Sequence, residues 1–254
     1  AETLHGAYEL GSVTIRTSVL QPGRHYYVRR QKMKIITDTK ENITGLVAEK
    51  VRELVKNKPD AVIGFSAGNS FKDVFSKLQG EELKAVRAFS VCEYAGCDNL
   101  GAQLESELYS MTGIVDFRRP KESEPESYDE EISACGGLDL VLLGVGLNGS
   151  IGFNEPATPF DSLTHLQQLT DATKRMKAEE LGGEKNVPSH GVTMGLKTLF
   201  GAKSVILLAL GEEKAPIVRK LVHGRTDTYI PAAMLQLHMN MTLCLDNDAA
   251  SKLD

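Results

Sequence analysis

The sequence predicts an α/β protein, with a doubly wound, Rossmann-like parallel sheet covered by helices on both faces and a single domain. Short apolar runs rich in β-branched residues alternate with stretches in which apolar residues recur every three to four positions, as in βαβ units. The chain has 254 residues, of which 41% are hydrophobic and 25% charged. This composition is ordinary for a globular domain with a sizeable core.

The elements follow one another from residue 33 onwards. A strand is predicted at residues 34–37 and a helix at residues 40–56, where apolar residues fall at helical spacing. By the same reasoning we expect further strands at residues 61–65, 88–91, 138–143, 204–210 and 241–245, and helices at residues 71–78, 102–112 and 215–222. No linker, repeat or low-complexity tract divides residues 33–254, which we therefore assign to one domain.

Residues 1–32 differ from the rest of the chain. They alternate only weakly between polar and apolar residues and end in a basic cluster, after which Met33 begins a clean strand pattern. We interpret Met33 as the natural start of the domain and residues 1–32 as an extension or an added leader sequence.

Charge and cysteine content narrow the class of partner. The net charge of −5 is spread along the chain, which argues against nucleic acid or an anionic membrane surface as a partner. Four scattered cysteines without a C-x-x-C spacing indicate a reducing compartment. No apolar run approaches the roughly 20 residues that cross a bilayer. We therefore predict a cytoplasmic protein.

Chemistry is expected in four loops. In doubly wound sheets, ligands bind outside the carboxyl ends of the strands. The loops that follow predicted strands at that edge are residues 66–70, 92–97, 144–156 and 211–214.

Two of these loops are candidates for holding a phosphate group. One reads Ser66-Ala67-Gly68-Asn69-Ser70. A glycine lets the backbone approach a ligand closely, and the free N–H groups at a helix start attract an anion. Lys214, near the start of the helix at residues 215–222, could reach the same anion. The alternatives are an ordinary tight turn with a serine or asparagine cap, and a solvated surface lysine.

The loop at residues 144–156 is more specific. It reads GVGLNGSIGFNEP. Its glycines allow a sharply folded backbone against a ligand, and Asn148 and Asn154 can stabilise turns. Pro156 restricts the backbone of Glu155 and so holds that carboxylate at a defined point.

The stretch Leu143–Pro156 resembles the signature of the glucosamine-6-phosphate deaminase/isomerase family, which is related to the 6-phosphogluconolactonases. The resemblance extends over residues 33–246. It includes the loop at residues 66–70, Cys92-Glu93-Tyr94, the run at residues 192–196, Leu210-Gly211-Glu212-Glu213-Lys214, and residues 230–238. The details GGLDL, LNG and IPAAMLQLH are most similar to the galactosamine-6-phosphate branch.

The resemblance implies conversion of an amino-sugar 6-phosphate into a ketose 6-phosphate and ammonia, without a metal or organic cofactor. It implies a small-molecule sugar phosphate as the partner and a possible homo-oligomer. The phosphate ligands it implies are Ala67, Gly68, Asn69, Ser70 and Lys214, and the groups assisting ring opening are Asn148 and Glu155.

Two central positions depart from the family pattern. Cys92 stands where an aspartate shuttles the proton between C2 and C1, and Ser150 stands where a histidine opens the sugar ring. The arginine that some members place on the phosphate falls near Glu179. Serine cannot protonate a ring oxygen near neutral pH without activation, and cysteine is a base only as the thiolate. Glu93 is the candidate for a replacement base.

Three functions therefore stay open. The first is a sugar-phosphate isomerase/deaminase with impaired turnover, whose catalytic candidates are Cys92, Glu93, Asn148, Ser150 and Glu155. The second is a catalytically inactive binding or sensor protein for the same sugar phosphates. The third, a 6-phosphogluconolactonase-like hydrolase, is less favoured because that chemistry also depends on the histidine replaced at position 150.

Overall fold

The computed structural model describes residues 7–10, 13–17, 26–27, 33–78, 83–97, 99–179 and 181–253. The chain divides into two compact units, Ala1–Lys32 and Met33–Asp254. The first unit contains a three-stranded antiparallel sheet of β1 (Ala7–Leu10), β2 (Val13–Thr17) and β3 (Tyr26–Tyr27). The origin of residues 1–32 as an extension or leader stays a prediction.

The second unit is built on a parallel sheet in the order β4-β13-β12-β9-β5-β6-β8. Every neighbouring pair in it is parallel. Its strands are β4 (Lys34–Asp38), β5 (Val62–Phe65), β6 (Arg87–Ser90), β8 (Asp116–Arg118), β9 (Leu140–Gly144), β12 (Val205–Ala209) and β13 (Met241–Asp246). The predicted fold class is confirmed.

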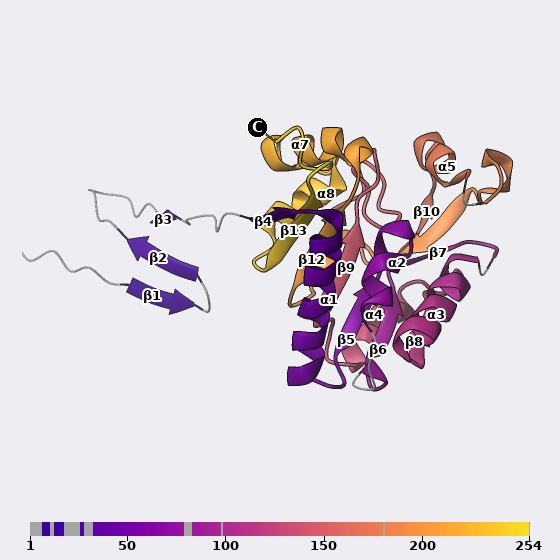
Figure 1. Cartoon of the computed structure of the whole chain (residues 1–254), viewed down its shortest axis with the longest axis horizontal. Coiled ribbons are helices and arrows are strands. Elements are labelled where there is room, and N and C mark those ends of the chain that lie inside the picture. Colours follow the sequence, from indigo (N-terminus) through magenta and orange to yellow (C-terminus); the bar gives the residue numbers. More distant parts are fainter. Residues whose placement is uncertain are drawn as a thin grey trace, which may run out of the picture. The chain divides into compact units, whose positions relative to one another are not determined.

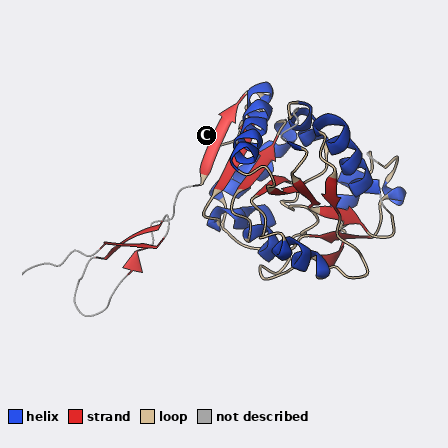
Figure 2. Cartoon of the chain, turned by 90° about the horizontal axis from the view of Figure 1, so that it is seen from below, coloured by secondary structure: helices blue, strands red, loops and turns tan. Residues whose placement is uncertain are grey.

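Helices cover both faces of this sheet (Figures 1 and 2). They are α1 (Lys40–Asn57), α2 (Asn69–Ser76), α3 (Asn99–Thr112), α4 (Ser127–Ala134), α5 (Asp171–Lys177), α6 (Leu196–Phe200), α7 (Ala215–His223) and α8 (Pro231–Met234). Short 3-10 turns are η2 (Glu184–Asn186), η3 (Glu212–Lys214) and η4 (Leu235–Leu237). The sequence patterns did not predict α4, α5, α6 or α8.

The core lies in two layers because successive side chains of a strand point to opposite faces. Val141 and Leu143 of β9 pack in one apolar cluster with residues of α6 and α7. Leu140 and Leu142 pack in the other cluster with residues of α1, α2 and α3. This burial on both faces explains the nearly continuous apolar strand runs in the sequence.

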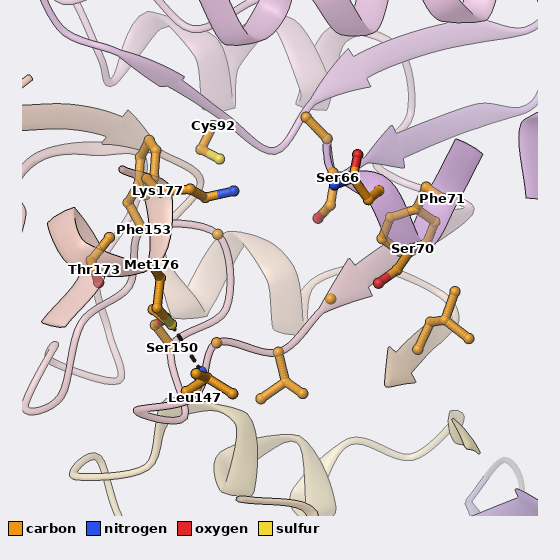
Figure 3. Close-up of a pocket in the computed structure, with 18 of the residues that line it drawn as sticks. Ser66, Ser70, Phe71, Cys92, Leu147, Ser150, Phe153, Thr173, Met176 and Lys177 are labelled. Carbon is orange, nitrogen blue, oxygen red and sulfur yellow. Dashed lines mark hydrogen bonds between the residues drawn. The ribbon is translucent and has the colours of Figure 1, made fainter. Parts of the chain in front are cut away.

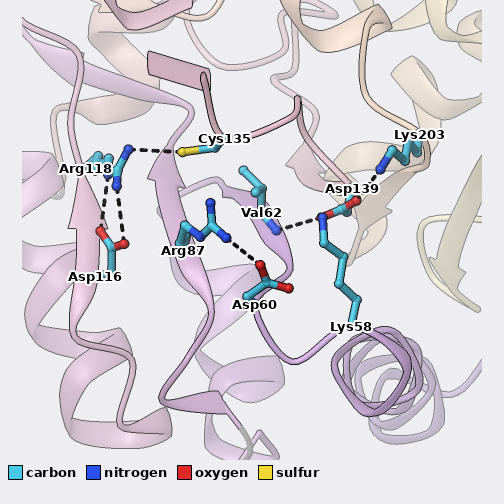
Figure 4. Close-up of polar contacts among 9 residues, drawn as sticks. All are labelled: Lys58, Asp60, Val62, Arg87, Asp116, Arg118, Cys135, Asp139 and Lys203. Atoms are coloured by element: carbon cyan, nitrogen blue, oxygen red, sulfur yellow. Dashed lines mark hydrogen bonds and ion pairs between the residues drawn. The ribbon is translucent and has the colours of Figure 1, made fainter. Parts of the chain in front are cut away.

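Two ion pairs to the buried carboxylate of Asp139 hold the start of β9. Asp139 is 4% exposed and receives hydrogen bonds from Lys58 Nζ at 2.7 Å, Lys203 Nζ at 2.7 Å and the Val62 N–H at 2.8 Å (Figure 4). Burial by itself raises the pKa of Asp139, but these hydrogen bonds outweigh it and hold the pKa below its ordinary value. The carboxylate thus joins β9 to β5 and to the α1 end.

The order of the sheet reverses between β5 and β9. From β5 the chain builds outwards through β6 to β8, then returns to β9 on the other side of β5 and continues through β12 and β13. Loops that leave neighbouring strands at such a switch point diverge and leave a crevice at the carboxyl edge. The loops at residues 66–70 and 144–156 leave β5 and β9 there.

A second, antiparallel sheet stands at this edge, in the order β10-β11-β7. It consists of β10 (His165–Gln168), β11 (His190–Thr193) and β7 (Cys92–Tyr94). The expectation that residues 92–97 form a loop is therefore wrong for Cys92–Tyr94. A three-residue strand carries too little periodicity to be recognised, and its pairing with β11 joins residues about a hundred positions apart.

Candidate functional site

A cavity of about 310 Å³ opens at the switch point. The loops after β5 and β9, the first residue of β7, the helix α5 and the turn η3 all contribute to its wall. Figure 3 shows Ser66 and Ser70 on one side of this space and Cys92 and Lys177 on the other. The site therefore has two ends, each built from different elements.

The first end is the loop that begins α2. All five of its residues, Ser66 to Ser70, line the cavity. Gly68 is the N-cap of α2, with φ of +132°, and no side chain caps the helix. A positive φ of this size favours glycine. The first N–H groups of α2 are thus without a side-chain cap beside the cavity, and the alternative of a serine or asparagine cap is not what the structure shows.

Ser66 adds an orphaned group to this end. Its side-chain hydroxyl is buried and makes no hydrogen bond within the part of the chain that the structure describes. Buried polar groups in native proteins nearly always have a hydrogen-bond partner. An unpaired hydroxyl at a cavity wall is therefore a candidate to hydrogen-bond a ligand. The sequence patterns did not single out Ser66.

Lys214 lies at the same cavity, at the end of η3. Its side chain is only 17% exposed, and its ammonium is 3.4 Å from the carboxylate of Glu213. The preceding turn is anchored because the Gly211 N–H donates to the carboxylate of Asp246. A half-buried, cavity-lining position distinguishes Lys214 from a solvated surface lysine.

Cys92 and Ser150 both line the cavity. Burial raises the pKa of the Cys92 thiol to about 12, the charge of Lys177 opposes this rise, and the charge of Glu93 adds to it. The side chain at position 92 is thus a neutral thiol near pH 7. Ser150 is 5% exposed, and its backbone N–H donates to the Asn148 side-chain oxygen at 3.1 Å.

Asn148 and Glu155 form a pair next to Ser150 rather than in the cavity wall. The Asn148 side-chain amide donates to a Glu155 carboxylate oxygen at 2.8 Å, and the Thr170 N–H donates to the other at 3.1 Å. Gly146 permits this folding, because a Cβ there would lie 2.3 Å from the Ser150 hydroxyl oxygen. The structure therefore brings Asn148, Ser150 and Glu155 together as the loop sequence predicts.

Glu93 is not among the groups that line the cavity, which removes the support for its role as a replacement base. Its carboxylate accepts hydrogen bonds from the N–H groups of Tyr94 at 2.7 Å, Leu100 at 3.1 Å and Gly101 at 2.6 Å. Neighbouring residues of a strand point to opposite sides. Because Cys92 faces the cavity, Glu93 faces away from it, towards the start of α3.

Lys177 is a cavity residue that the sequence patterns missed. It ends α5, and Thr173 and Met176 of the same helix also line the cavity. The Leu147 N–H donates to the sulfur of Met176 at 3.3 Å, which joins α5 to the loop after β9 (Figure 3). The sequence held one local signal for the start of α5, namely the threonine at position 170. Its side chain caps the helix by accepting a hydrogen bond from the Thr173 N–H at 3.2 Å.

Two other kinds of feature are absent from the described residues. No group of three or more histidine, cysteine, aspartate or glutamate side chains that could hold a metal occurs among them. None of the helices in this part of the chain is long and apolar enough to cross a membrane.

Comparison with known proteins shows which family this chain resembles in sequence. A model of the family described as glucosamine-6-phosphate isomerases/6-phosphogluconolactonase matches residues 37–244. A glucosamine-6-phosphate deaminase of Mycoplasma mycoides subsp. mycoides is 33% identical over 238 residues, covering 86% of this chain and 96% of that protein. One from Clostridium botulinum is 32% identical over 239 residues, covering 87% and 98%.

Solved structures agree with this result. A monomeric glucosamine-6-phosphate deaminase of the NagB superfamily superposes with a TM-score of 0.81 at 31% identity, covering 87% of this chain and 100% of that one. The 6-phosphogluconolactonase of Trypanosoma brucei has a TM-score of 0.68 at 17% identity, covering 88% and 99%, and shares the fold.

Proposed function

The chain belongs to the glucosamine-6-phosphate isomerase/6-phosphogluconolactonase family, and on that premise we propose that its cavity binds a sugar 6-phosphate and that its turnover of hexosamine 6-phosphates is diminished. The observation that carries this proposal is the division of the cavity. The residues that the family resemblance implies for phosphate binding line one end of the cavity, and Cys92 and Ser150, which stand in place of the two implied proton-transferring side chains, line the other.

The phosphate end has the features that an anion requires. The uncapped first turn of α2 carries partial positive charge and free N–H groups. Lys214 supplies a full positive charge, and Ser66 a hydroxyl without a partner among the described residues. We assign the phosphate ester to Ala67, Gly68, Asn69, Ser70 and Lys214, with Ser66 as an added ligand.

The other end explains why turnover would be slow. Release of ammonia from a hexosamine 6-phosphate requires proton transfer at C1 and C2 and to the ring oxygen. Cys92 offers a neutral thiol and Ser150 a hydroxyl for these steps. A well-placed acid or base contributes about 10²–10⁴-fold to a rate. We therefore expect a residual activity, with Asn148 and Glu155 assisting through Ser150.

A second candidate is binding without turnover, as in a sensor of sugar phosphates. It is favoured by the same neutral groups at positions 92 and 150. A lactonase-like activity is less favoured, because that chemistry also depends on the histidine that Ser150 replaces. The protein is expected to work in the cytoplasm without a metal or organic cofactor, and a homo-oligomer stays a prediction.

Calorimetric titration and an ammonia assay test the proposal together. Purified protein is titrated with glucosamine 6-phosphate, galactosamine 6-phosphate and inorganic phosphate, and the two sugars are then assayed for ammonia release. Binding with slow ammonia release supports an impaired enzyme, and binding without release supports the sensor. If none of the three compounds binds, the assignment of the cavity is refuted.

A further inference from the structure

Lys214, which we assign to the phosphate ester, stands on a turn that is too short to be stable by itself. The turn η3 has three residues, and no side chain among the described residues caps its start. Isolated helical turns of this length are unstable in water. The far end of η3 is fixed, because α7 follows at once and buries Ile217, Val218 and Leu221. Its start, at Gly211, needs support from elsewhere in the chain.

Asp246 supplies this support from the last position of β13. The Gly211 N–H is shared between the two oxygens of its carboxylate, at 3.0 and 2.9 Å. The carbonyl of Gly211 in turn accepts a hydrogen bond from the Lys214 N–H at 3.0 Å. A single residue, Gly211, thus connects the carboxylate to the backbone of Lys214.

The carboxylate of Asp246 is itself held in place. It is buried, with 5% of the residue exposed, and its Oδ1 atom also accepts a hydrogen bond from the Ala249 N–H at 2.8 Å. Leu245 pairs with Ala209, the last residue of β12, so Asp246 follows the point where the chain leaves β12 towards η3. Hydrogen bonds to an ionised group are roughly twice as strong as neutral ones. The edge of the central sheet therefore fixes the start of η3.

We propose that Asp246 is a positioning residue, which sets the place of the Lys214 ammonium at the phosphate end of the cavity. Asp246 is not among the residues that line the cavity. A lysine side chain is flexible, so its ammonium is directed at one site only if the backbone beneath it is fixed. This role rests on the proposed phosphate site and adds to it a residue outside the lining. Loss of the carboxylate should weaken anion binding through Lys214.

Calorimetric titration with inorganic phosphate tests this role in a double-mutant cycle. Asp246→Asn keeps the size of the side chain but replaces one acceptor oxygen by an N–H donor, which meets the Gly211 N–H and cannot accept from it. In the otherwise unmodified protein, this change should weaken the affinity by roughly fivefold. In the Lys214→Met background the same change should weaken it by less than about twofold, because the group that Asp246 positions is gone.

Asp139→Asn is the matched control. It makes the same change at a carboxylate that is 4% exposed and accepts a hydrogen bond from the Val62 N–H, but that lies before the start of β9, at the edge of the sheet opposite the cavity. It should lower the melting temperature and leave the affinity for phosphate unchanged. A loss of affinity that came only from a weakened fold would appear in both variants.

Hydrogen exchange in the ligand-free protein gives a second readout. The Gly211 amide hydrogen should exchange at least about fivefold faster in Asp246→Asn than in the unmodified protein, and unchanged in Asp139→Asn. An unchanged exchange rate at Gly211 would overturn the positioning role. So would an unchanged affinity for phosphate in Asp246→Asn, an equal loss with and without Lys214, or an equal loss in Asp139→Asn. If the unmodified protein binds neither phosphate nor a sugar phosphate, the proposed function fails, whereas the exchange rate at Gly211 still reports whether Asp246 anchors η3.

Discussion

The side chain of Asn148 connects Ser150 to Glu155. Its oxygen accepts a hydrogen bond from the Ser150 N–H at 3.1 Å, and its nitrogen donates to the Glu155 carboxylate at 2.8 Å. The buried carboxylate of Glu155 is thus separated from Ser150 by one side chain, that of Asn148. The Ser150 hydroxyl cannot itself act as an acid near neutral pH. The structure thus holds an amide and a carboxylate beside position 150, where the family resemblance implies a proton-transferring residue and this chain has a serine.

Restoring both replaced side chains should therefore restore turnover. In Cys92→Asp/Ser150→His, the new imidazole lies next to the Asn148–Glu155 pair, and the new carboxylate lies at the Cys92 end of the cavity. We expect ammonia release from hexosamine 6-phosphates to rise by about 10²-fold or more over the unmodified protein. Each single variant should rise less. A double variant that binds the sugars but releases ammonia no faster would show that the sugar lies elsewhere.

Removal of Lys214 should weaken phosphate binding. A hydrogen bond to a charged group contributes about 1.5–3 kcal/mol, so Lys214→Met should weaken the affinity for inorganic phosphate and for sugar phosphates by about 10-fold or more. Lys220→Met is the control, because Lys220 is an exposed cation on the following helix. Calorimetric titration measures both. Equal effects of the two variants would mean that only the general charge of the protein matters.

Ser66 and Ser90 offer a matched comparison of two buried hydroxyls. The Ser90 hydroxyl donates to the Cys92 carbonyl at 2.8 Å, whereas that of Ser66 has no partner among the described residues. Ser90→Ala should lower the free energy of unfolding by about 1–2 kcal/mol, and Ser66→Ala should leave it unchanged or raise it. Ser66→Ala should nevertheless reduce the rise in melting temperature that inorganic phosphate produces. If that rise is unaffected, Ser66 is not a phosphate ligand.

Cys92 should resist alkylation until the solution is strongly alkaline. Because burial raises its pKa to about 12, the reactive thiolate is rare at pH 8. The half-buried Cys97 and Cys135 should be labelled first by iodoacetamide, as peptide mass spectrometry can measure. The raised pKa also links this thiol to stability. Its contribution to the free energy of unfolding is fully present below the unfolded pKa of the thiol and is lost as the pH rises towards 12. Rapid labelling of Cys92 at pH 8 in the folded protein would contradict the burial.

Asp139 should make stability fall in acid. Its pKa is lowered in the folded state, so its contribution is present above the unfolded pKa near 3.8 and is lost as the pH falls through the lower folded value. Asp139→Asn should cost about 1–3 kcal/mol at pH 7 and should flatten the acid side of the stability curve. Asp60→Asn breaks a more exposed pair with Arg87 (Figure 4) and should cost about 0–1 kcal/mol. Denaturant unfolding between pH 2 and 7 measures both, and equal costs would contradict the role of burial.

Much of the architecture could be predicted locally. The apolar strands and the long helix at residues 40–57 have strong periodicity, so their positions follow from the sequence. The loops at residues 66–70 and 144–156 were recognisable because glycines and turn residues follow buried strands directly. Short elements such as α5, β7, β10 and β11 were not recognisable, since they carry no continuous apolar run of the kind that marks the equally short buried strands β5 and β9.

The sequence by itself determined the sheet, the two glycine-rich loops at its carboxyl edge and the replacement, at positions 92 and 150, of the two side chains that the family resemblance implies for proton transfer. Only the tertiary structure decided which groups surround them. The pairing of β7 with β11 turns Cys92 towards the cavity and Glu93 away from it, and α5 brings Lys177 to the same wall. These outcomes depend on contacts between residues far apart in the chain, and a local pattern contains no information on which side chains such contacts bring together.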